Sequence, residues 1–434
     1  MYDYRYDSVR WPPPPAWGTG TWSDSLGSKK PQQLRLGAIG LGRAFRSMAP
    51  SLRAHPDVKL VAAADKNVSA VRNCARDFGA QPFEDADALI RDPDIDAVYI
   101  ATPHELHTPQ ALSAFEHGKH VIVEKPMALS LENCQTMVDA AERNQRYLVV
   151  GHSHGFDPPI LHAARLVASG LLGAIRMVNA MNYTDWLYRP RRPEELVPDT
   201  AGVALNQASH QVDIIRLLAG GKATSVRAMC GAWDRSRPAI GAYAALIGFD
   251  NGAFASLCYS GYDYFNSDEF NGWIGELGRA KPVNAHGSAR RALARQLADQ
   301  TETSIKTDEG YASVGAPLPA QMFGVDGQKH PQFGVILASC DRGDVRTSAQ
   351  GVTIFSADGR REIPVPAGRG GGPKAGVFDQ LYDAAINGVA PLHSGRWGMA
   401  NLEVCLAIVE SWKSGKEIRL RHQLAPDFGK DPVV

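Results

Sequence analysis

A glutamate and a lysine stand side by side at the end of a short apolar segment, a pair that could hold and polarise a bound hydroxyl group. In HGKHVIVEKPMAL, residues 120–123 read as a buried strand that Glu124 and Lys125 follow directly. Pro126 then ends the strand. Strand ends of an open parallel sheet face bound ligands, so we expect the Lys125 ammonium to hydrogen-bond a hydroxyl and favour its ionised form. The alternative is a plain surface ion pair, which the buried setting disfavours.

A second polar group lies on the apolar helix predicted over residues 202–221. Asn206, His210 and Asp213 are spaced i, i+4 and i+7, so they share one helix face. Histidine suits acid/base chemistry because its ordinary pKa lies near neutrality. From the residues alone, that role for His210 and a core histidine hydrogen-bonded to Asp213 remain equally open.

A glycine-rich turn predicts a phosphate-binding loop. Gly40-x-Gly42 follows a strand and opens a helix, where backbone N–H groups and the helix N-terminus can receive a pyrophosphate. The third position of this fingerprint is Phe45, so the match is incomplete. Asp65 ends the next strand, where a carboxylate can accept hydrogen bonds from an adenosine ribose. It would repel a 2′-phosphate and so favours NAD, although nearby basic residues such as Arg43 leave NADP open.

The elements around these residues predict two domains. Apolar strands alternate with amphipathic helices over residues 34–155, which predicts a doubly wound parallel Rossmann sheet. Residues 156–434 predict an α+β domain with a largely antiparallel sheet, so the fold class is α/β with an added α+β domain. Residues 279–330 read as an insertion, whose role as a lid, an oligomer arm or plain surface stays open. Residues 1–33 are Pro-rich and predict a flexible tail rather than an arm on a neighbouring subunit.

Composition excludes several classes of protein. The 434 residues carry 46 Lys and Arg against 46 Asp and Glu, so no nucleic-acid partner is expected. No apolar run is long enough to span a membrane, and no membrane partner is expected. Six scattered cysteines favour a reducing, cytoplasmic location. HELH and HSH lack the further ligands of a tetrahedral metal site, so we predict no metal.

Five segments resemble the Gfo/Idh/MocA family in order and spacing, over about Leu34 to Leu420: GAIGLGRAF, ATPHELH, GKHVIVEKP, SGLLGAIRMV and SHQVD. In that family the lysine of Glu-Lys-Pro is catalytic, the Lys-Pro bond is often cis, and the histidine before x-x-Asp is an acid and base. The resemblance therefore implies Lys125 and His210 as catalytic residues in hydride transfer from a secondary alcohol to a nicotinamide. The family commonly has aspartate where this chain has Asn206, which removes a charge that would raise the basicity of His210.

The resemblance also implies which residues bind the cofactor. Glu124 would orient Lys125 or the nicotinamide ribose. The predicted cofactor-binding residues are Gly40, Leu41, Gly42, Arg43, Ala44, Phe45, Asp65, Thr102, Pro103, His104, His107, Glu124 and Lys125.

The substrate is predicted from an arginine-rich loop. Arginine forks suit carboxylates; the alternative is a solvated loop whose arginines pair with Glu194 and Glu195. YRPRRPEEL resembles phthalate 4,5-cis-dihydrodiol dehydrogenases within the family, which implies a carboxylated cyclic cis-diol oxidised to a catechol. The alternatives are a sugar or inositol dehydrogenase and a non-catalytic NAD(P)-binding regulator. The resemblance also implies a homodimer or homotetramer. The predicted substrate-binding residues are Asn206, Asp213, His154, Arg189, Arg191 and Arg192.

Overall fold

The computed structural model describes residues 33–152, 154–198, 201–308, 310–311, 329–367 and 374–428. The chain divides into two units, residues 1–32 and residues 33–434. Except for Gln33, the predicted tail lies outside the described residues, as do residues 312–328 of the predicted insertion.

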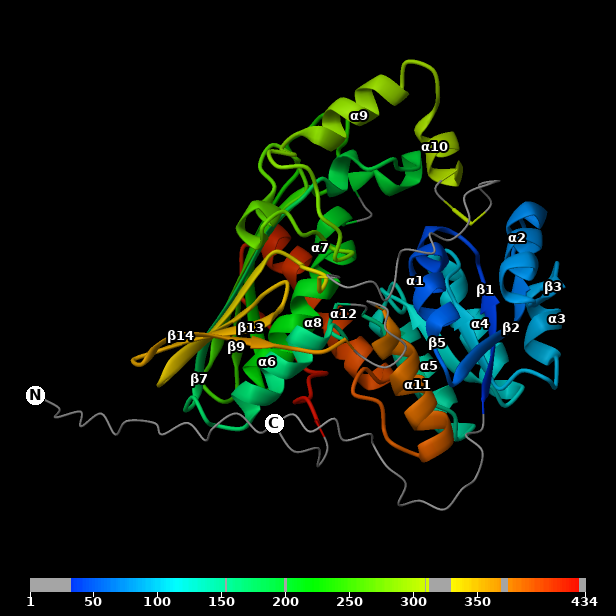
Figure 1. Cartoon of the computed structure of the whole chain (residues 1–434), viewed down its shortest axis with the longest axis horizontal. Coiled ribbons are helices and arrows are strands. Elements are labelled where there is room, and N and C mark those ends of the chain that lie inside the picture. The colour runs from blue at the N-terminus through cyan, green and yellow to red at the C-terminus, as the bar shows by residue number, and fades with distance from the viewer. Residues whose placement is uncertain are drawn as a thin grey trace, which may run out of the picture. The chain divides into compact units, whose positions relative to one another are not determined.

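The first half of the described chain contains a parallel sheet. Its strands are β1 (Leu34–Ile39), β2 (Val58–Ala64), β3 (Gln81–Phe83), β4 (Ala97–Ile100), β5 (His120–Glu124) and β6 (Leu148–Gly151). They pair in the order β3-β2-β1-β4-β5-β6 (Figure 1). The central strands are almost fully buried because helices cover both faces, which explains their continuous apolar sequences. The predicted Rossmann sheet is confirmed, and the short strand β3 is an element that the pattern did not reveal.

Helices connect these strands, and capping residues fix where several begin. They are α1 (Arg43–Ala54), α2 (Val68–Phe78), α3 (Ala86–Arg91), α4 (His104–Glu116) and α5 (Leu131–Arg143). The Asn67 side chain accepts N–H groups of Ser69 and Ala70, and the Ser130 side chain accepts that of Asn133. Asn and Ser are favourable at these positions because their side chains satisfy N–H groups that have no partner at a helix start.

The second half contains a nine-stranded mixed sheet. Its strands are β7 (Ile175–Tyr183), β8 (Ala223–Gly231), β9 (Ala242–Phe249), β10 (Phe254–Ser260), β11 (Val335–Cys340), β12 (Gly343–Thr347), β13 (Gly351–Ser356), β14 (Gly359–Pro364) and β15 (Ile418–Arg419). The order is β14-β13-β12-β11-β7-β10-β9-β8-β15. Neighbours are antiparallel except β7 and β10, which confirms the largely antiparallel sheet. Gly252, with φ +84°, lies in the turn of the hairpin between β9 and β10.

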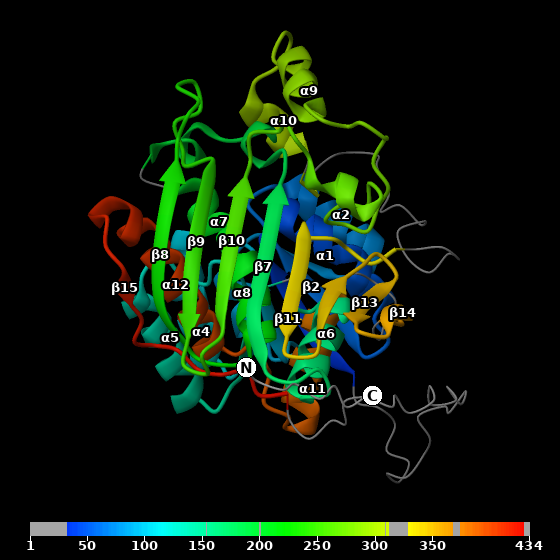
Figure 2. The same cartoon turned by 90° about the vertical axis from the view of Figure 1, so that its left-hand side faces the viewer.

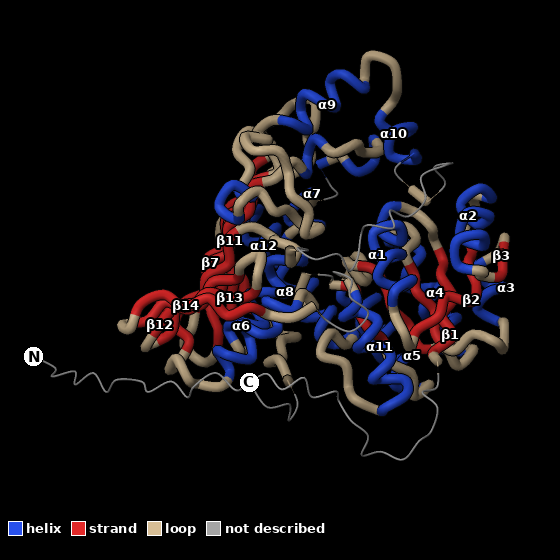
Figure 3. Tube along the Cα trace, viewed as in Figure 1, coloured by secondary structure: helices blue, strands red, loops and turns tan. Residues whose placement is uncertain are grey.

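Four helices of this half lie on one face of the large sheet (Figures 2 and 3). They are α6 (Pro158–Ala168), α7 (Gly202–Asn206), α8 (Ala208–Ala219) and α12 (Gly395–Ser414). Helix α11 (Ala375–Asn387) packs instead against strands of the Rossmann sheet, and α9 (Ser288–Gln296) and α10 (Glu302–Asp308) lie in the predicted insertion. Helix α12 packs against β8 of the large sheet and, on the Rossmann side, against α5 and β6. Helix α12 therefore connects the two sheets.

One helix differs from its sequence prediction. The apolar stretch 202–221 is not a single helix but α7 and α8, with Gln207 between them. Asn206 is therefore the last residue of α7, on a different helix from His210 and Asp213.

Candidate active site

Lys125 lies at the end of β5 and reaches across to α7. Its Nζ donates to the main-chain oxygen of Asn206 at 2.8 Å and to Asn206 Oδ1 at 3.3 Å. Burial lowers the pKa of Lys125 to about 8, with Glu124 and Glu276 opposing this and Arg191 and Lys374 adding to it. The neighbouring Glu124 accepts the Tyr99 hydroxyl at 2.6 Å, and the Lys125–Pro126 peptide is cis. Glu124 and Lys125 thus bind Tyr99 and Asn206 and do not form an exposed ion pair with each other.

His210 lies near Lys125, on the first turn of α8. It is 6% exposed, and its Nδ1 has no hydrogen-bond partner within the described residues. Its ring contacts those of His154, with centroids 4.9 Å apart, and Phe333, at 5.0 Å. Burial lowers the pKa of His210 well below 6.5, and the Lys125 charge lowers it further. His210 is therefore a neutral imidazole at neutral pH, able to accept a proton.

Asp213 lies apart from His210, although both are on α8. The Trp397 Nε1 donates to Asp213 Oδ1 at 2.5 Å, and His393 Nε2 lies 3.2 Å from Oδ2. Asp213 is fully buried, and His393 is the main charge that lowers its pKa against the opposing effect of burial. The alternative in which Asp213 satisfies His210 therefore does not occur, and the structure does not place Asp213 with the predicted substrate-binding group.

His154 does join the group. Its Nδ1 lies 2.9 Å from Asp157 Oδ2, and burial lowers its pKa to about 4. Burial raises the pKa of Asp157. His154 and Phe333, with ring centroids 4.5 Å apart, form a wall beside His210.

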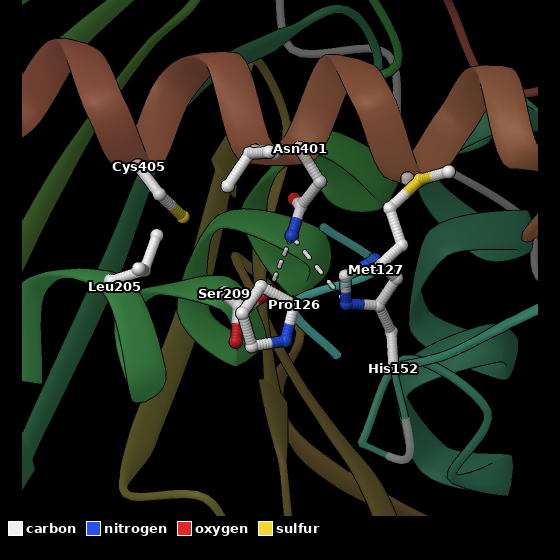
Figure 4. A pocket seen from close by; sticks show the side chains of 9 residues that line it. Pro126, Met127, His152, Leu205, Ser209, Asn401 and Cys405 are labelled. Carbon is white, nitrogen blue, oxygen red and sulfur yellow. Dashed lines mark hydrogen bonds between the residues drawn. The ribbon is translucent and has the colours of Figure 1, made fainter. Parts of the chain in front are cut away.

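A small cavity adjoins Pro126 and Met127, in the turn that follows Lys125 (Figure 4). Asn401 crosses it, donating to the Ser209 main-chain oxygen at 2.8 Å and approaching His152 Nδ1 at 3.5 Å. It is lined by Pro126, Met127, His152, Leu205, Ser209, Gly398, Asn401, Leu402 and Cys405. The cavity lies on the α12 side of the site, so α12 supports the strand end that carries Lys125.

The three predicted arginines differ in their surroundings. Arg189 is held by Asp185 and Glu276, each at 2.8 Å. Arg191 is 3% exposed, donates to the Trp186 main-chain oxygen at 2.9 Å and stacks on the Trp186 ring. Arg192 is exposed. Only Arg189 and Arg191 therefore face the interior.

Lys374 is a cation that the sequence prediction missed. It is 3% exposed at the start of α11, and its ammonium forms no ion pair within 4 Å among the described residues. Burial lowers its pKa, opposed by Asp157, Glu276 and Glu124. Its charge in turn lowers the pKa of His154 and of His210. The only sequence signal was a lone lysine between a glycine run and a helix.

The glycine-rich loop fits a dinucleotide. Gly40 has φ +87°, and a Cβ there would lie 2.6 Å from the Ala101 oxygen. A Cβ on Gly42 would meet nothing within 4 Å, so the space in front of the loop is open. The α1 N-terminus, with Arg43 and Ala44, has no capping side chain and can receive a phosphate.

Asp65 supports this loop. Its Oδ2 accepts the Leu41 N–H at 2.6 Å, and its Oδ1 accepts the Asn67 N–H at 2.7 Å. Phe45, in place of the third small residue, is fully buried in the core.

The segment 102–107 follows β4. Pro103 caps α4 and is exposed, and the Thr102 hydroxyl donates to Gln110 at 2.6 Å. Burial lowers the pKa of His104 to about 4. His107 is fully buried, with its ring nitrogens 3.0 Å from the Thr102 oxygen and 3.2 Å from the Pro126 oxygen. It ties the β4 end to the turn after Lys125 rather than facing the loop.

The described residues contain no group of three His, Cys, Asp or Glu side chains arranged to hold a metal ion. None of their helices combines the length and apolarity needed to cross a bilayer.

This fold and site define a class, the dinucleotide-binding α/β oxidoreductases. Residues 34–152 match the model of an oxidoreductase family with an NAD-binding Rossmann fold, and residues 160–281 match the GFO/IDH/MocA C-terminal domain. The chain belongs to the GFO/IDH/MocA family of NAD-binding oxidoreductases, which confirms the resemblance and the cofactor.

The chain is also similar to individual proteins of known name or structure. The chain is 41% identical over 389 residues to 1-carboxy-3-chloro-3,4-dihydroxycyclohexa-1,5-diene dehydrogenase of Comamonas testosteroni, covering 88% of this chain and 95% of that protein. It is 32% identical over 196 residues to scyllo-inositol 2-dehydrogenase (NAD⁺) of Bacillus subtilis, covering 45% and 56%. A solved dehydrogenase structure from Bordetella bronchiseptica RB50 superposes with TM-score 0.84 at 40% identity, covering 89% of this chain and all of that one.

Proposed function

We propose that this protein is an NAD-dependent dehydrogenase that oxidises a carboxylated cyclic cis-dihydrodiol to a catechol. The observation that carries this is the approach of Lys125, from the NAD-binding half, to the stretch 206–210 of the second half. The relative from Comamonas testosteroni supports the substrate class, because its name describes a carboxylated dihydroxy-cyclohexadiene. Oxidation of one ring hydroxyl gives a ketone, and loss of the proton from the adjacent ring carbon enolises it to an aromatic catechol.

The lysine is arranged to hold the reacting oxygen. The Lys125 ammonium has three N–H groups. The main-chain oxygen and Oδ1 of Asn206 accept two of them, which leaves the third for the substrate hydroxyl. A positive charge at that oxygen stabilises the alkoxide as it develops. Bound NAD supplies the acceptor for the hydride that leaves the carbinol carbon.

His210 is arranged to receive the hydroxyl proton. Its Nδ1 has no partner within the described residues, and its lowered pKa keeps it unprotonated before reaction. His154, held by Asp157, and Phe333 restrict its ring from two sides. The packed rings exclude water, so the proton passes to the imidazole. In this proposal the Asn206 amide holds the lysine instead of supplying a charge to the relay.

We infer that Lys374 meets the substrate carboxylate. Arg189 already has two carboxylate partners, and Arg192 is exposed. Lys374 is a buried ammonium without an ion pair among the described residues, a costly state that an anionic ligand relieves. The prediction that the loop arginines bind the carboxylate stays untested, and a comparison of their variants with a Lys374 variant separates the two.

The test is a substrate panel with NAD. Purified protein is incubated with a carboxylated cis-dihydrodiol, an uncharged cis-dihydrodiol, scyllo-inositol and glucose, and NADH formation is followed by absorbance. We expect turnover of the carboxylated diol to exceed that of the others by at least about a hundredfold, because one buried charge pair is at stake. Lys125→Met should remove turnover but leave NADH binding nearly intact.

Other outcomes identify the alternatives. Preference for scyllo-inositol or glucose would indicate an inositol or sugar dehydrogenase. The similarity to scyllo-inositol 2-dehydrogenase of Bacillus subtilis, which covers 56% of that protein, supports this alternative. Tight NAD binding with no turnover on any substrate would indicate the non-catalytic regulator.

The domain, assembly and location predictions remain proposals. We propose that residues 34–155 bind NAD and that residues 156–434 bind the diol and mediate a homodimer or homotetramer. Three apolar side chains on the large sheet, Met229, Leu246 and Phe254, are about half exposed, which supports pairing of this face. All six cysteines are free, which fits a reducing cytoplasm. Light scattering and cell fractionation test these two points.

A further inference from the structure

Part of the predicted insertion crosses from the second half of the chain to the glycine-rich loop. The crossing segment, defined as residues 302–308 and 310–311, comprises α10 and the two described residues beyond it (Figure 1). Ile305 within it is 5% exposed, so the segment packs against the protein and does not project from it.

One end of the crossing segment is fastened to the second half. The Glu302 carboxylate accepts both terminal nitrogens of Arg237, at 2.7 and 2.8 Å, in a bidentate pair. Its Oε2 also accepts the Arg191 main-chain N–H at 2.8 Å. The start of α10 is therefore bound to the loop that carries the arginines.

The other end is fastened to the nucleotide-binding half. The Tyr311 N–H donates to the Leu41 oxygen at 3.1 Å, inside the glycine-rich loop itself. The Tyr311 hydroxyl donates to Asp77 at 2.8 Å, and the Asn73 side chain donates to the main-chain oxygen of Tyr311 at 3.2 Å. The Tyr311 ring packs edge-on against Phe45 with centroids 5.3 Å apart. The segment therefore spans the loop that receives the pyrophosphate.

Between these anchors lies a group of cations. Lys306 forms an ion pair with Glu195, and Arg191 Nη1 lies 3.9 Å from the same carboxylate. Arg43, at the α1 N-terminus, is close enough for its charge to lower the pKa of both Arg191 and Lys306, for which burial is the larger cause. Two positive charges, those of Lys306 and Arg191, thus lie at one carboxylate, and Arg43 adds a third at the start of α1. Cations gathered beside a helix N-terminus suit a doubly negative pyrophosphate.

We propose that the crossing segment is a strap that retains the bound dinucleotide: Lys306 and Arg191 bind the pyrophosphate, and the dinucleotide leaves only when Tyr311 detaches. The strap acts on cofactor binding and does not depend on which alcohol is oxidised. It assigns a role to Arg191 other than the predicted contact with substrate.

Fragments of the cofactor test the phosphate contact. Binding of NADH, ADP-ribose and adenosine is measured by calorimetry on the full chain. Lys306→Ala should weaken NADH and ADP-ribose about tenfold, the contribution of one charge-assisted hydrogen bond, and leave adenosine unchanged. Lys306→Arg should restore most of the loss. Lys222→Ala, at an exposed lysine, is the matched control and should change nothing.

Release kinetics test the retention. Stopped-flow measurement of NADH release should show about a tenfold faster rate for Tyr311→Ala, and a smaller increase for Tyr311→Phe, which loses only the hydroxyl bond to Asp77. The phenylalanine variant keeps the ring that packs on Phe45, so it separates release from misfolding. An unchanged release rate in both variants, or equal weakening of adenosine and ADP-ribose by Lys306→Ala, would overturn the proposal. Neither assay needs an alcohol substrate, so its outcome is independent of the dihydrodiol assignment.

Discussion

At the scale of single residues, the proposed chemistry depends on how burial sets two charges. Lys125 is partly buried, and its pKa of about 8 lies close enough to neutrality for the ammonium to lose its proton within a measurable range. His210 is buried with a pKa far below 6.5 and is uncharged there. Neutral pH lies between these two pKa values, so the Lys125 ammonium and the unprotonated His210 imidazole coexist there.

The pH profile of oxidation follows from Lys125. The protonated form is the active one, so kcat/KM should fall as pH rises above about 8. Asn206→Asp places a carboxylate where Oδ1 now lies 3.3 Å from the ammonium, which raises the pKa of Lys125. The falling limb should then move up by about one pH unit. A wild-type profile that keeps rising through this range, or a limb that the variant does not move, would contradict the ammonium as the active form.

Lys374 should determine recognition of the carboxylate. Lys374→Met removes the buried positive charge while keeping an unbranched side chain, and we expect KM for the carboxylated diol to rise about a hundredfold. For an uncharged cis-dihydrodiol KM should stay within about twofold, because no carboxylate is present to lose its partner. Steady-state kinetics on both substrates check this, with Lys416→Met at an exposed site as control. Equal effects on both substrates would assign Lys374 to folding, not to recognition.

At the scale of elements, the turn into α6 depends on a residue with no side chain. A Cβ on Gly155 would lie 1.8 Å from Asp213 Oδ2 and 2.6 Å from His393 Nε2. Glycine therefore allows the turn to approach the buried Asp213 cluster on α8. This contact, and not a catalytic contact with His210, is where the structure places Asp213.

Gly155→Ala should accordingly destabilise the fold. The clash displaces a buried, hydrogen-bonded carboxylate, and we expect a loss of about 2–4 kcal/mol in the free energy of unfolding. Gly388→Ala is the control: its Cβ would meet nothing within 4 Å, and only its left-handed φ of +69° should cost about 1 kcal/mol. Urea denaturation measures the free energy of unfolding of both variants. Similar losses in the two would show that the residues around Asp213 can move to accommodate the added methyl group.

Sequence patterns predicted these elements well where local rules decide. The alternation of apolar strands with helices over residues 34–155 and the glycine turn between a strand and a helix at Gly40 are local signals, and each is present. The break between α7 and α8 is not local. The Asn206 oxygen accepts Lys125 Nζ and the Ser209 hydroxyl, and the His210 N–H bonds to Gln207 instead. Apolar spacing continues through this point, so periodicity could not reveal it.

Site residues were predictable where a local motif marks them. The positions of Lys125, His210 and the glycine loop follow from motifs. The partners of Asp213 lie about 180 residues away on and before α12, and the isolated charge of Lys374 depends on what surrounds it in three dimensions. Neither pattern is visible along the chain, which is why Asp213 was grouped with His210 and Lys374 was missed.

At the scale of the whole described chain, helix α12 packs against strands of both sheets, and several buried histidines lie near it. Helix α12 packs on β8 and on β6, and α11 packs on β1, β5 and β6. His152 and His154 lie at this junction, and burial lowers the pKa of each to about 4. Protonating them requires opening the junction.

Acid should therefore destabilise the protein in a defined window. In the unfolded chain these histidines titrate near 6.5, so between that pH and about 4 the unfolded state binds more protons and stability falls as pH falls. At pH 5 the loss should be about 2 kcal/mol for each histidine. Denaturation at pH 7 and pH 5 measures it, and His152→Gln should reduce the difference by roughly that amount. An equal difference in the variant would show that other groups control acid unfolding.

The edge-on packing of Tyr311 against Phe45 limits which segments of this chain can be exchanged separately. Phe45 fills the place where a dinucleotide fingerprint usually has a small residue, and Tyr311 supplies part of the surface around it. Removing the insertion would leave a void beside the Phe45 ring. Transferring the insertion to a relative that has glycine at the position of Phe45 would leave the Tyr311 ring without its packing partner. A chimera that exchanges α1 and the insertion together should fold, whereas one that exchanges either alone should lose stability.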